Sequence, residues 1–186
     1  MKVAIFCSAN NNLPDKYFRC AEELAAWLVT NGDDIVFGGT QAGLMGCIAD
    51  KVKALRKQEA VAGRLIGVVP RIVEEGGRSV SDMDVEIPCE NLSDRKDIMI
   101  NHSDISIALP GGIGTLDEIF TVASAASIGY HRKQVIMYNI DGFWNSFTAM
   151  LDDLSLKGVI RGPWQRHFIV CDTFEEIQNT LKQINI

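Results

Sequence analysis

Short apolar runs rich in valine and isoleucine alternate along the chain with longer stretches whose apolar residues recur every three or four positions. The short runs predict β-strands, and the longer stretches predict amphipathic helices. The predicted strands cover residues 3–7, 35–37, 65–69, 85–87, 105–109, 135–138 and 168–170. The predicted helices cover residues 15–30, 44–57, 93–102, 115–128, 143–156 and 174–184.

This alternation predicts a doubly wound α/β fold, in which about seven mostly parallel strands form one sheet flanked by helices. Ligands of such sheets bind in the crevice above the carboxyl ends of the strands. At 186 residues the chain is long enough for one well-buried core, so residues 1–186 are expected to form a single domain. The polar segment 76–79 is expected to be a mobile loop within it.

Hydrophobic residues make up 47% of the chain and charged residues 23%, a balance typical of globular proteins. The formal net charge of −6 argues against a nucleic-acid partner, because no broad positive field would attract a phosphate backbone. No run approaches the roughly 20 apolar residues that span a bilayer, and the N-terminal segment lacks the apolar core of a signal peptide. We therefore expect no membrane partner. Five scattered cysteines without a CxxC pair indicate a reducing, cytoplasmic location.

The segment LPGGIGTLDE at 109–118 ends a predicted strand and begins a predicted helix. Glycines let the backbone turn sharply and approach an anion, and a helix N-terminus attracts negative charge. The segment therefore predicts a phosphate cradle, to which Thr115 adds a hydroxyl donor. Alternatively, the glycines serve only a tight turn. Glu118 is either a carboxylate of the site or an ordinary acidic partner for the helix dipole, and its position alone does not separate the two.

Two adjacent cations, Arg95 and Lys96, lie near the start of another predicted helix, where the helix dipole disfavours positive charge. They form either a solvated basic face or an anion site, since arginine can hold a phosphate or a carboxylate through two parallel hydrogen bonds. The histidines at 102, 131 and 167 are isolated, and no pair has the i,i+4 spacing of a helical metal site. We therefore expect no metal.

Three segments resemble motifs of the LONELY GUY (LOG) family. Residues 110–118 match the signature PGGxGTxxE at every fixed position, residues 95–99 resemble its Arg-Lys pair followed by methionine, and residues 38–46 resemble its glycine-rich turn before GLMG. The strand and helix order resembles the family across nearly the whole chain, which implies a Rossmann-like sheet. Thr40 and Ala123 depart from plant members, and these differences concern the substrate more than the reaction.

The resemblance implies a cofactor-independent hydrolase that cleaves the N-glycosidic bond of a purine nucleoside 5′-monophosphate, such as AMP or a cytokinin nucleotide. Positive charge develops on the ribose in the transition state of such a cleavage. The resemblance implies that Glu118 stabilises this charge and that Arg95 supports the departing base. It also implies substrate or phosphate contacts from Gly39, Lys96, Gly111, Gly112, Gly114, Thr115, Leu116, Asp117 and one of Glu74 and Glu75, of which Glu75 is taken as the candidate.

Related proteins are dimers whose sites borrow residues across the interface, so a homodimer is expected. Predicted helices such as 44–57, with few charges on one face, could support it.

Two other functions remain open. Proteins of this type often carry the label lysine decarboxylase, which would require pyridoxal phosphate on a lysine and a partner for its pyridinium nitrogen, and no such constellation is visible. A nucleotide-binding carrier without turnover, resembling molybdenum-cofactor carriers, would use a similar architecture and glycine loop. Glu118 together with Arg95 favours the enzyme.

Overall fold

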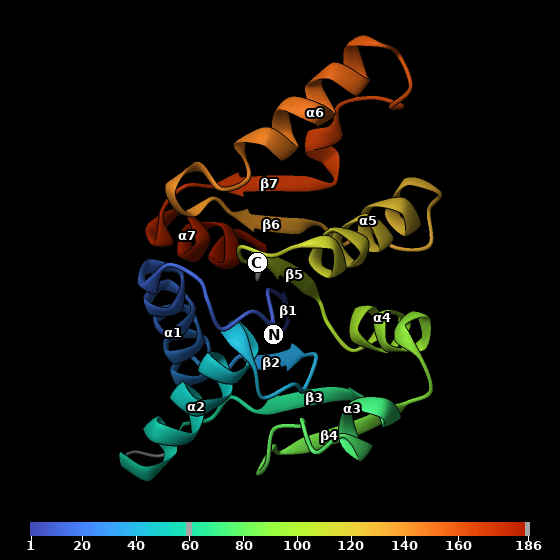
Figure 1. Cartoon of the computed structure of the whole chain (residues 1–186). Helices are drawn as coiled ribbons and strands as arrows, with labels where there is room; N and C mark the ends of the chain where they lie inside the picture. Colours follow the sequence, from blue (N-terminus) through green and yellow to red (C-terminus); the bar gives the residue numbers. More distant parts are fainter. Residues whose placement is uncertain (59–60, 185–186) are drawn as a thin grey trace.

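The computed structural model describes residues 1–58 and 61–184 and contains one seven-stranded sheet (Figure 1). Its strands are β1 Lys2–Phe6, β2 Asp34–Phe37, β3 Leu65–Pro70, β4 Val85–Cys89, β5 Ile105–Ala108, β6 Val135–Tyr138 and β7 Phe168–Cys171. All neighbouring strands pair in parallel, in the order β4-β3-β2-β1-β5-β6-β7. The predicted α/β fold with about seven strands is confirmed, and the sheet is parallel throughout.

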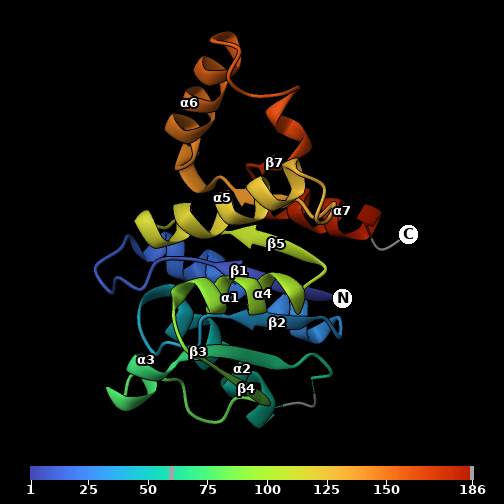
Figure 2. The same ribbon diagram turned by 90° about the vertical axis from the view of Figure 1, so that its right-hand side faces the viewer.

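Helices cover both faces of the sheet (Figures 1 and 2). They are α1 Asp15–Thr30, α2 Gly43–Gln58, α3 Arg71–Glu75, α4 Leu92–Asn101, α5 Ile113–Ser127, α6 Asn145–Leu156 and α7 Phe174–Ile184, with short 3-10 turns η1 Ile140–Gly142 and η2 Trp164–Arg166. Buried residues of α1, α2 and α7 share one hydrophobic cluster, and those of α4, α5 and α6 share another. The sheet lies between these two clusters.

The strands supply both clusters because successive side chains of a strand point to opposite faces. In β1, Val3 and Ile5 join the cluster under α1 and α2, whereas Ala4 and Phe6 join the cluster under α4 and α5. All four are at most 1% exposed. A strand that is buried on both faces needs apolar residues at every position, which is why these strands appear in the sequence as continuous apolar runs.

Most predicted elements have the expected position, with α1, β6 and α7 matching at both ends. The start of α4 differs, because Asn91 caps it by accepting hydrogen bonds from the backbone N–H groups of Ser93 and Asp94 at 2.9 and 3.0 Å. The predicted helix from 115 begins at Ile113 instead, and the helix predicted from 143 begins at Asn145. The five-residue α3 was not predicted, since one turn is too short to show a periodic pattern.

The segment 76–79, which we expected to be mobile, is hydrogen-bonded to the glycine-rich turn after β2. The N–H of Val80 donates to the carbonyl of Gly39 at 2.8 Å, and the N–H of Gln41 donates to the carbonyl of Arg78 at 2.8 Å. Thr40 and Ser79 form an isolated antiparallel bridge between these bonds. The two loops therefore hold each other at this edge of the sheet.

The chain reverses its direction of winding between β1 and β5. From β1 it adds β2, β3 and β4 on one side, and it then returns to add β5 on the other side of β1. The loops that follow β1 and β5 therefore diverge above the sheet, which opens a crevice at their carboxyl ends. Across the part of the chain that the structure describes, none of the helices has the length and apolar character needed to cross a membrane.

Candidate active site

A cavity of about 270 Å³ lies at this reversal point. Segments from four parts of the chain line it: the end of β1, the first turn of α2, the first turn of α4 and the start of α5. The lining residues are Cys7, Ser8, Ala9, Met45, Arg95, Gly112, Gly114, Thr115 and Glu118. The sequence motifs around 45, 95 and 112–118 thus converge, although they are far apart in the chain.

The N-terminus of α5 carries no side-chain cap. Its N-cap residue is Gly112, whose carbonyl accepts the first helical hydrogen bond from the N–H of Leu116 at 3.0 Å. The N–H groups of residues 113–115 therefore precede the first helical hydrogen bond, as at any helix start. Together with the helix dipole they favour an anion at this end of α5.

The glycines of this loop differ in how much space a side chain would have at each position. A Cβ on Gly111 would overlap the Thr115 side chain, so internal packing requires glycine at 111. A Cβ on Gly112 or on Gly114 would meet no atom within 4 Å. Packing within the chain thus does not explain glycine at 112 and 114. Gly112 is the N-cap, where glycine is tolerated, whereas Gly114 is a helical residue, and glycine within a helix is less stable than alanine by about 1 kcal/mol.

Glu118 and Arg95 face each other across the cavity. The Arg95 Nη1 atom lies 3.5 Å from the Glu118 Oε1 atom, and their side chains are only 14% and 10% exposed. Burial raises the pKa of Glu118 to about 7, with Arg95 and Lys96 lowering it and Asp117 raising it. A carboxyl with this pKa can gain or lose a proton near neutral pH, which suits a group that acts in acid–base or electrostatic catalysis.

The comparisons with known proteins identify the family of the chain. A family model described as possible lysine decarboxylase matches residues 45–181. The cytokinin riboside 5′-monophosphate phosphoribohydrolase LOG5 of Arabidopsis thaliana is 34% identical over 169 residues, which cover 91% of this chain and 71% of that protein. The probable cytokinin riboside 5′-monophosphate phosphoribohydrolase LOGL3 of Oryza sativa subsp. japonica is 33% identical, covering 98% of this chain and 83% of that protein.

The chain belongs to the LOG family. Solved structures of more distant proteins share its fold. The X-ray structure of TM1055 has a TM-score of 0.72 at 20% identity and covers 98% of each chain. The molybdenum cofactor binding protein of Rippkaea orientalis has a TM-score of 0.70 at 16% identity, covering 100% of this chain and 97% of that one.

Only some of the residues expected at the site line the cavity. Of the residues expected at the site, Arg95, Glu118, Gly112, Gly114 and Thr115 line the cavity together. The others lie around it or away from it, for separate physical reasons.

Lys96 lies outside the cavity lining. Its ammonium group donates two hydrogen bonds to the Asp117 carboxylate, at 2.8 and 2.7 Å. The Lys96 side chain is 16% exposed and the Asp117 side chain is 54% exposed, so the pair lies between α4 and α5 with its carboxylate open to solvent. Adjacent residues of a helix point about 100° apart, which separates Lys96 from Arg95. Leu116 packs against the hydrophobic cluster below α5.

Gly39 and Glu75, both expected at the site, do not line the cavity. Gly39 has a φ of +67°, and a Cβ there would lie 2.5 Å from Cγ2 of Val69, so its glycine serves the turn and its packing on β3. Glu74 and Glu75 are exposed on α3, which follows β3, and β2 and β1 separate β3 from β5. Neither glutamate lines the cavity in this chain.

Four lining residues were not expected at the site: Cys7, Ser8, Ala9 and Met45. Ser8 connects the two sides of the cavity, because its N–H donates to the carbonyl of Pro110 at 3.2 Å and its carbonyl accepts from the N–H of Leu44 at 2.9 Å. Position at the end of the first strand is the signal that could have found residues 7–9. Burial raises the pKa of Cys7, so its thiol stays protonated at neutral pH and behaves as a small apolar group.

Within residues 1–58 and 61–184, no three His, Cys, Asp or Glu side chains are grouped so that they could hold a metal ion. The cavity lining likewise includes no lysine. A Schiff base with pyridoxal phosphate needs a lysine at the reacting centre, so the residues of this cavity do not fit that group.

Proposed function

We propose that this LOG-family chain hydrolyses the N-glycosidic bond of purine nucleoside 5′-monophosphates. Water adds to C1′ of the ribose while the bond from C1′ to the base nitrogen breaks, and the products are the free base and ribose 5-phosphate. The names of the relatives LOG5 and LOGL3 support this reaction. The observation that carries it is the buried Arg95–Glu118 pair beside an uncapped helix N-terminus.

The start of α5 is the proposed phosphate site. Gly112 and Gly114 leave open space above the backbone, and Thr115 lines the cavity next to them. A 5′-phosphate bound there would accept hydrogen bonds from backbone N–H groups and gain from the helix dipole. The phosphate would hold the ribose against Glu118, so that binding energy remote from the broken bond contributes to the rate.

Glu118 is the proposed catalytic carboxylate. Positive charge that develops on the ribose in the transition state would be stabilised by a carboxylate beside it, and the carboxylate can also orient the attacking water. Because burial raises its pKa to about 7, Glu118 can take a proton from that water as the bond to C1′ forms. Arg95, held 3.5 Å away, would balance negative charge on the departing base.

A carrier without turnover is the second candidate, because the molybdenum cofactor binding protein of Rippkaea orientalis has the same fold. At 16% identity this likeness concerns the fold alone. A carrier needs no buried carboxyl whose pKa lies near neutrality, whereas hydrolysis uses one. We therefore favour the enzyme.

The decisive experiment incubates the purified protein with AMP and, separately, with adenosine. We expect AMP to give adenine and ribose 5-phosphate, and adenosine to react at least about a hundredfold more slowly, since each charge-assisted hydrogen bond to the phosphate is worth about 1.5–3 kcal/mol. Glu118→Gln should bind AMP but release no adenine. Equal rates for AMP and adenosine would overturn the phosphate site, and full turnover in Glu118→Gln would overturn the catalytic role of Glu118. Binding of AMP without release of adenine by the wild-type chain would favour the carrier.

We further propose that the protein is a homodimer formed through α5 and the turn that follows it. No residue from Ile119 to Tyr130 carries a charge, yet Phe120, Ile128 and Tyr130 are 38%, 68% and 81% exposed. The helix expected to supply the dimer surface, α2, instead buries Leu44, Met45, Ile48, Ala49 and Val52 in the core. A surface without charges is typical of the centre of a protein interface.

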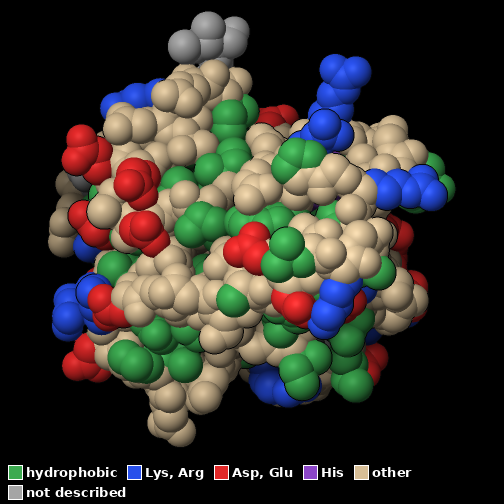
Figure 3. All heavy atoms as spheres, turned by 90° about the horizontal axis from the view of Figure 1, so that it is seen from above, with side chains coloured by type: hydrophobic (Ala, Val, Ile, Leu, Met, Phe, Trp, Pro, Cys, Tyr) green, Lys and Arg blue, Asp and Glu red, His purple; other side chains and the backbone are tan. Residues whose placement is uncertain are grey.

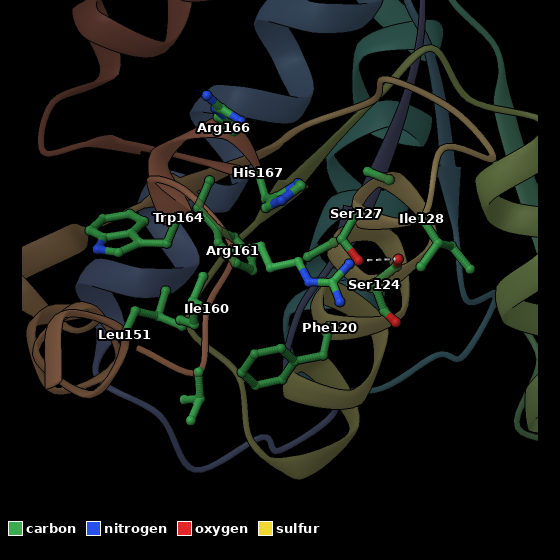
Figure 4. Close-up of a pocket in the computed structure, with 14 residues that line it drawn as sticks. Phe120, Ser124, Ser127, Ile128, Leu151, Ile160, Arg161, Trp164, Arg166 and His167 are labelled. Atoms are coloured by element: carbon green, nitrogen blue, oxygen red, sulfur yellow. Dashed lines mark hydrogen bonds between the residues drawn. The ribbon is translucent and has the colours of Figure 1, made fainter. Parts of the chain in front are cut away.

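Hollows flank α5 on both sides. One, of about 970 Å³, lies between α5 and the segment from α6 to β7, and Phe120, Leu151, Ile160 and Trp164 line it (Figure 4). Two others, of about 450 and 400 Å³, lie on the α4 side and include Tyr130. Figure 2 shows α6 extending away from α5, and Figure 3 shows hydrophobic side chains exposed among charged ones at the α6 and β7 end. In the proposed dimer, α5 of the second copy packs against α5 and these flanking hollows.

Light scattering tests the dimer. The wild-type chain should have twice the monomer mass, and Ile128→Glu should have the monomer mass because it places a charge in the centre of the contact. Ile72 on α3 is similarly exposed, at 72%, so Ile72→Glu is the matched control and should remain dimeric. A monomeric wild-type chain with full activity would exclude a site that needs both copies.

We also propose that residues 1–186 act as one LOG-type domain and that the protein is cytoplasmic. The single sheet of the described residues supports the first proposal. Five cysteines, all of them free thiols, support a reducing compartment.

A further inference from the structure

Gly38 lies directly after β2 and opens the glycine-rich turn. Its neighbour Gly39 has a φ of +67°, a conformation that favours glycine, but the φ of Gly38 lies outside the left-handed region. Backbone conformation therefore does not require glycine at 38. Another property of the position must account for it.

The guanidinium of Arg95 occupies the space where a side chain at 38 would begin. A Cβ on Gly38 would overlap Nη2 of Arg95 and would lie 2.6 Å from its Cζ and 3.0 Å from Sδ of Met45. The guanidinium thus lies against the bare Cα of Gly38. Because protein interiors are close-packed, even one methyl group here must displace Arg95 or the backbone.

Arg95 has no strong hydrogen bond that would hold it in place by itself. Its Nη1 lies 3.5 Å from Glu118 Oε1 and its Nη2 lies 3.9 Å from Met45 Sδ, while its buried Nε has no partner among the described residues. Charge-assisted hydrogen bonds of arginine are typically about 2.7–2.9 Å long. The position of the guanidinium therefore depends on the shape of its surroundings, above all on the gap at Gly38 and on Met45.

We propose that Gly38 is a positioning residue for Arg95: its missing side chain leaves the gap that sets the distance between the guanidinium and Glu118. The proposal rests on the proposed function only for its effect on turnover. Gly38 itself does not line the cavity, so it acts through Arg95.

An electrostatic consequence separates positioning from a merely structural role. The charged and titratable groups that act on Glu118 or respond to it are Arg95 and Lys96 from α4, Asp117 from α5 and Cys7 from the end of β1. Burial raises the pKa of Glu118, and Arg95 is the largest influence that lowers it. If Arg95 moves away, its positive charge no longer lowers the pKa of Glu118, so the pKa must rise further because of burial. A loss of packing that leaves Arg95 in place would not change it.

The test compares Gly38→Ala with the matched control Gly67→Ala. Gly67 pairs with Phe37 across β2 and β3. A Cβ there would overlap Sδ of Met83, at the flexible end of that side chain, and would lie 2.9 Å from its Cε and 3.4 Å from Cα of Gly39, but it would not meet Arg95. The Glu118 carboxyl is titrated by carbon-13 NMR of glutamate-labelled protein and assigned by its absence in Glu118→Gln. In parallel, kcat/KM is measured with AMP.

We expect Gly38→Ala to raise the pKa of Glu118 by about one unit or more and to lower kcat/KM about a hundredfold, whereas Gly67→Ala should leave the pKa unchanged. In an Arg95→Ala background, Gly38→Ala should change neither quantity further, because the two substitutions remove the same interaction. An unchanged pKa of Glu118 in folded Gly38→Ala would overturn the proposal. So would a loss of kcat/KM from Gly38→Ala that is as large in the Arg95→Ala background as in the wild type.

Two outcomes keep the test decisive. If Gly38→Ala fails to fold, a Gly38→Ala/Arg95→Ala variant that folds as well as Arg95→Ala supports the overlap, and one that also fails overturns it. If the wild-type chain releases no adenine from AMP, the proposed function fails. The NMR titration then still decides whether Gly38 positions Arg95.

Discussion

Replacing Glu118 by glutamine should stabilise the protein at alkaline pH while it removes turnover. Burial, the largest influence, raises the pKa of Glu118 from 4.5 to about 7. The folded chain therefore binds this proton more tightly than the unfolded chain does. The stability that this carboxyl contributes is fully present below the unfolded pKa and is lost as the pH rises through the folded pKa.

The size of the effect follows from the shift. A difference of about 2.5 units corresponds to about 3 kcal/mol of unfolding free energy, at 1.36 kcal/mol per unit. Because the Glu118 side chain is only 10% exposed, solvent screens little of this energy. Glutamine resembles the protonated carboxyl and never ionises, so Glu118→Gln avoids the free-energy cost of a buried negative charge. We expect the two proteins to agree within about 1 kcal/mol at pH 5 and Glu118→Gln to be more stable by about 3 kcal/mol at pH 8.5.

Urea unfolding at both pH values measures this difference. The protein concentration must be the same throughout, since the stability of a dimer depends on it. Glu86 is an exposed glutamate on β4, and Glu86→Gln should stay within about 0.5 kcal/mol of the wild type at both pH values. A Glu118→Gln variant whose stability relative to the wild type were the same at pH 5 and pH 8.5 would refute the raised pKa.

Three further outcomes are expected. With AMP, kcat/KM should rise about tenfold per pH unit below pH 7 and level off above it, because the ionised form of Glu118 is the acting one; a flat profile from pH 5.5 to 8.5 would contradict this role. Gly114→Ala has space for its methyl group and should raise the thermal midpoint by favouring the helix. It should also raise KM for AMP by at least about tenfold by obstructing a phosphate, for which each charge-assisted hydrogen bond is worth about 1.5–3 kcal/mol; an unchanged KM would count against the phosphate site. Arg95→Ala should lose far more turnover than Lys96→Ala, since only Arg95 lines the cavity, and equal losses in the two steady-state assays would contradict that assignment.

Features that depend on residues close together in the sequence could be predicted from the sequence alone. Continuous apolar runs indicate strands that are buried on both faces, and a repeat of three to four indicates a helix with one buried face, so the parallel α/β sheet followed from the pattern. The segment 110–118 is also local, because Glu118 and Gly114 lie one turn apart on the same helix. The place of the site at the carboxyl ends of the strands followed from the fold class.

Only the tertiary structure decided which residues face the cavity and with what charge. Arg95 and Lys96 are adjacent and both are cations, but Arg95 lies against Gly38 and lines the cavity, while Lys96 pairs with Asp117 outside it. The pKa of Glu118 is raised by burial that β1, α2 and α4 together create, and no local pattern encodes that burial. The exposed apolar surface is likewise on α5 and the turn after it rather than on α2, because α2 buries its apolar side in the core. Periodicity shows that a helix has an apolar side, whereas the contacts between distant segments decide whether that side is covered.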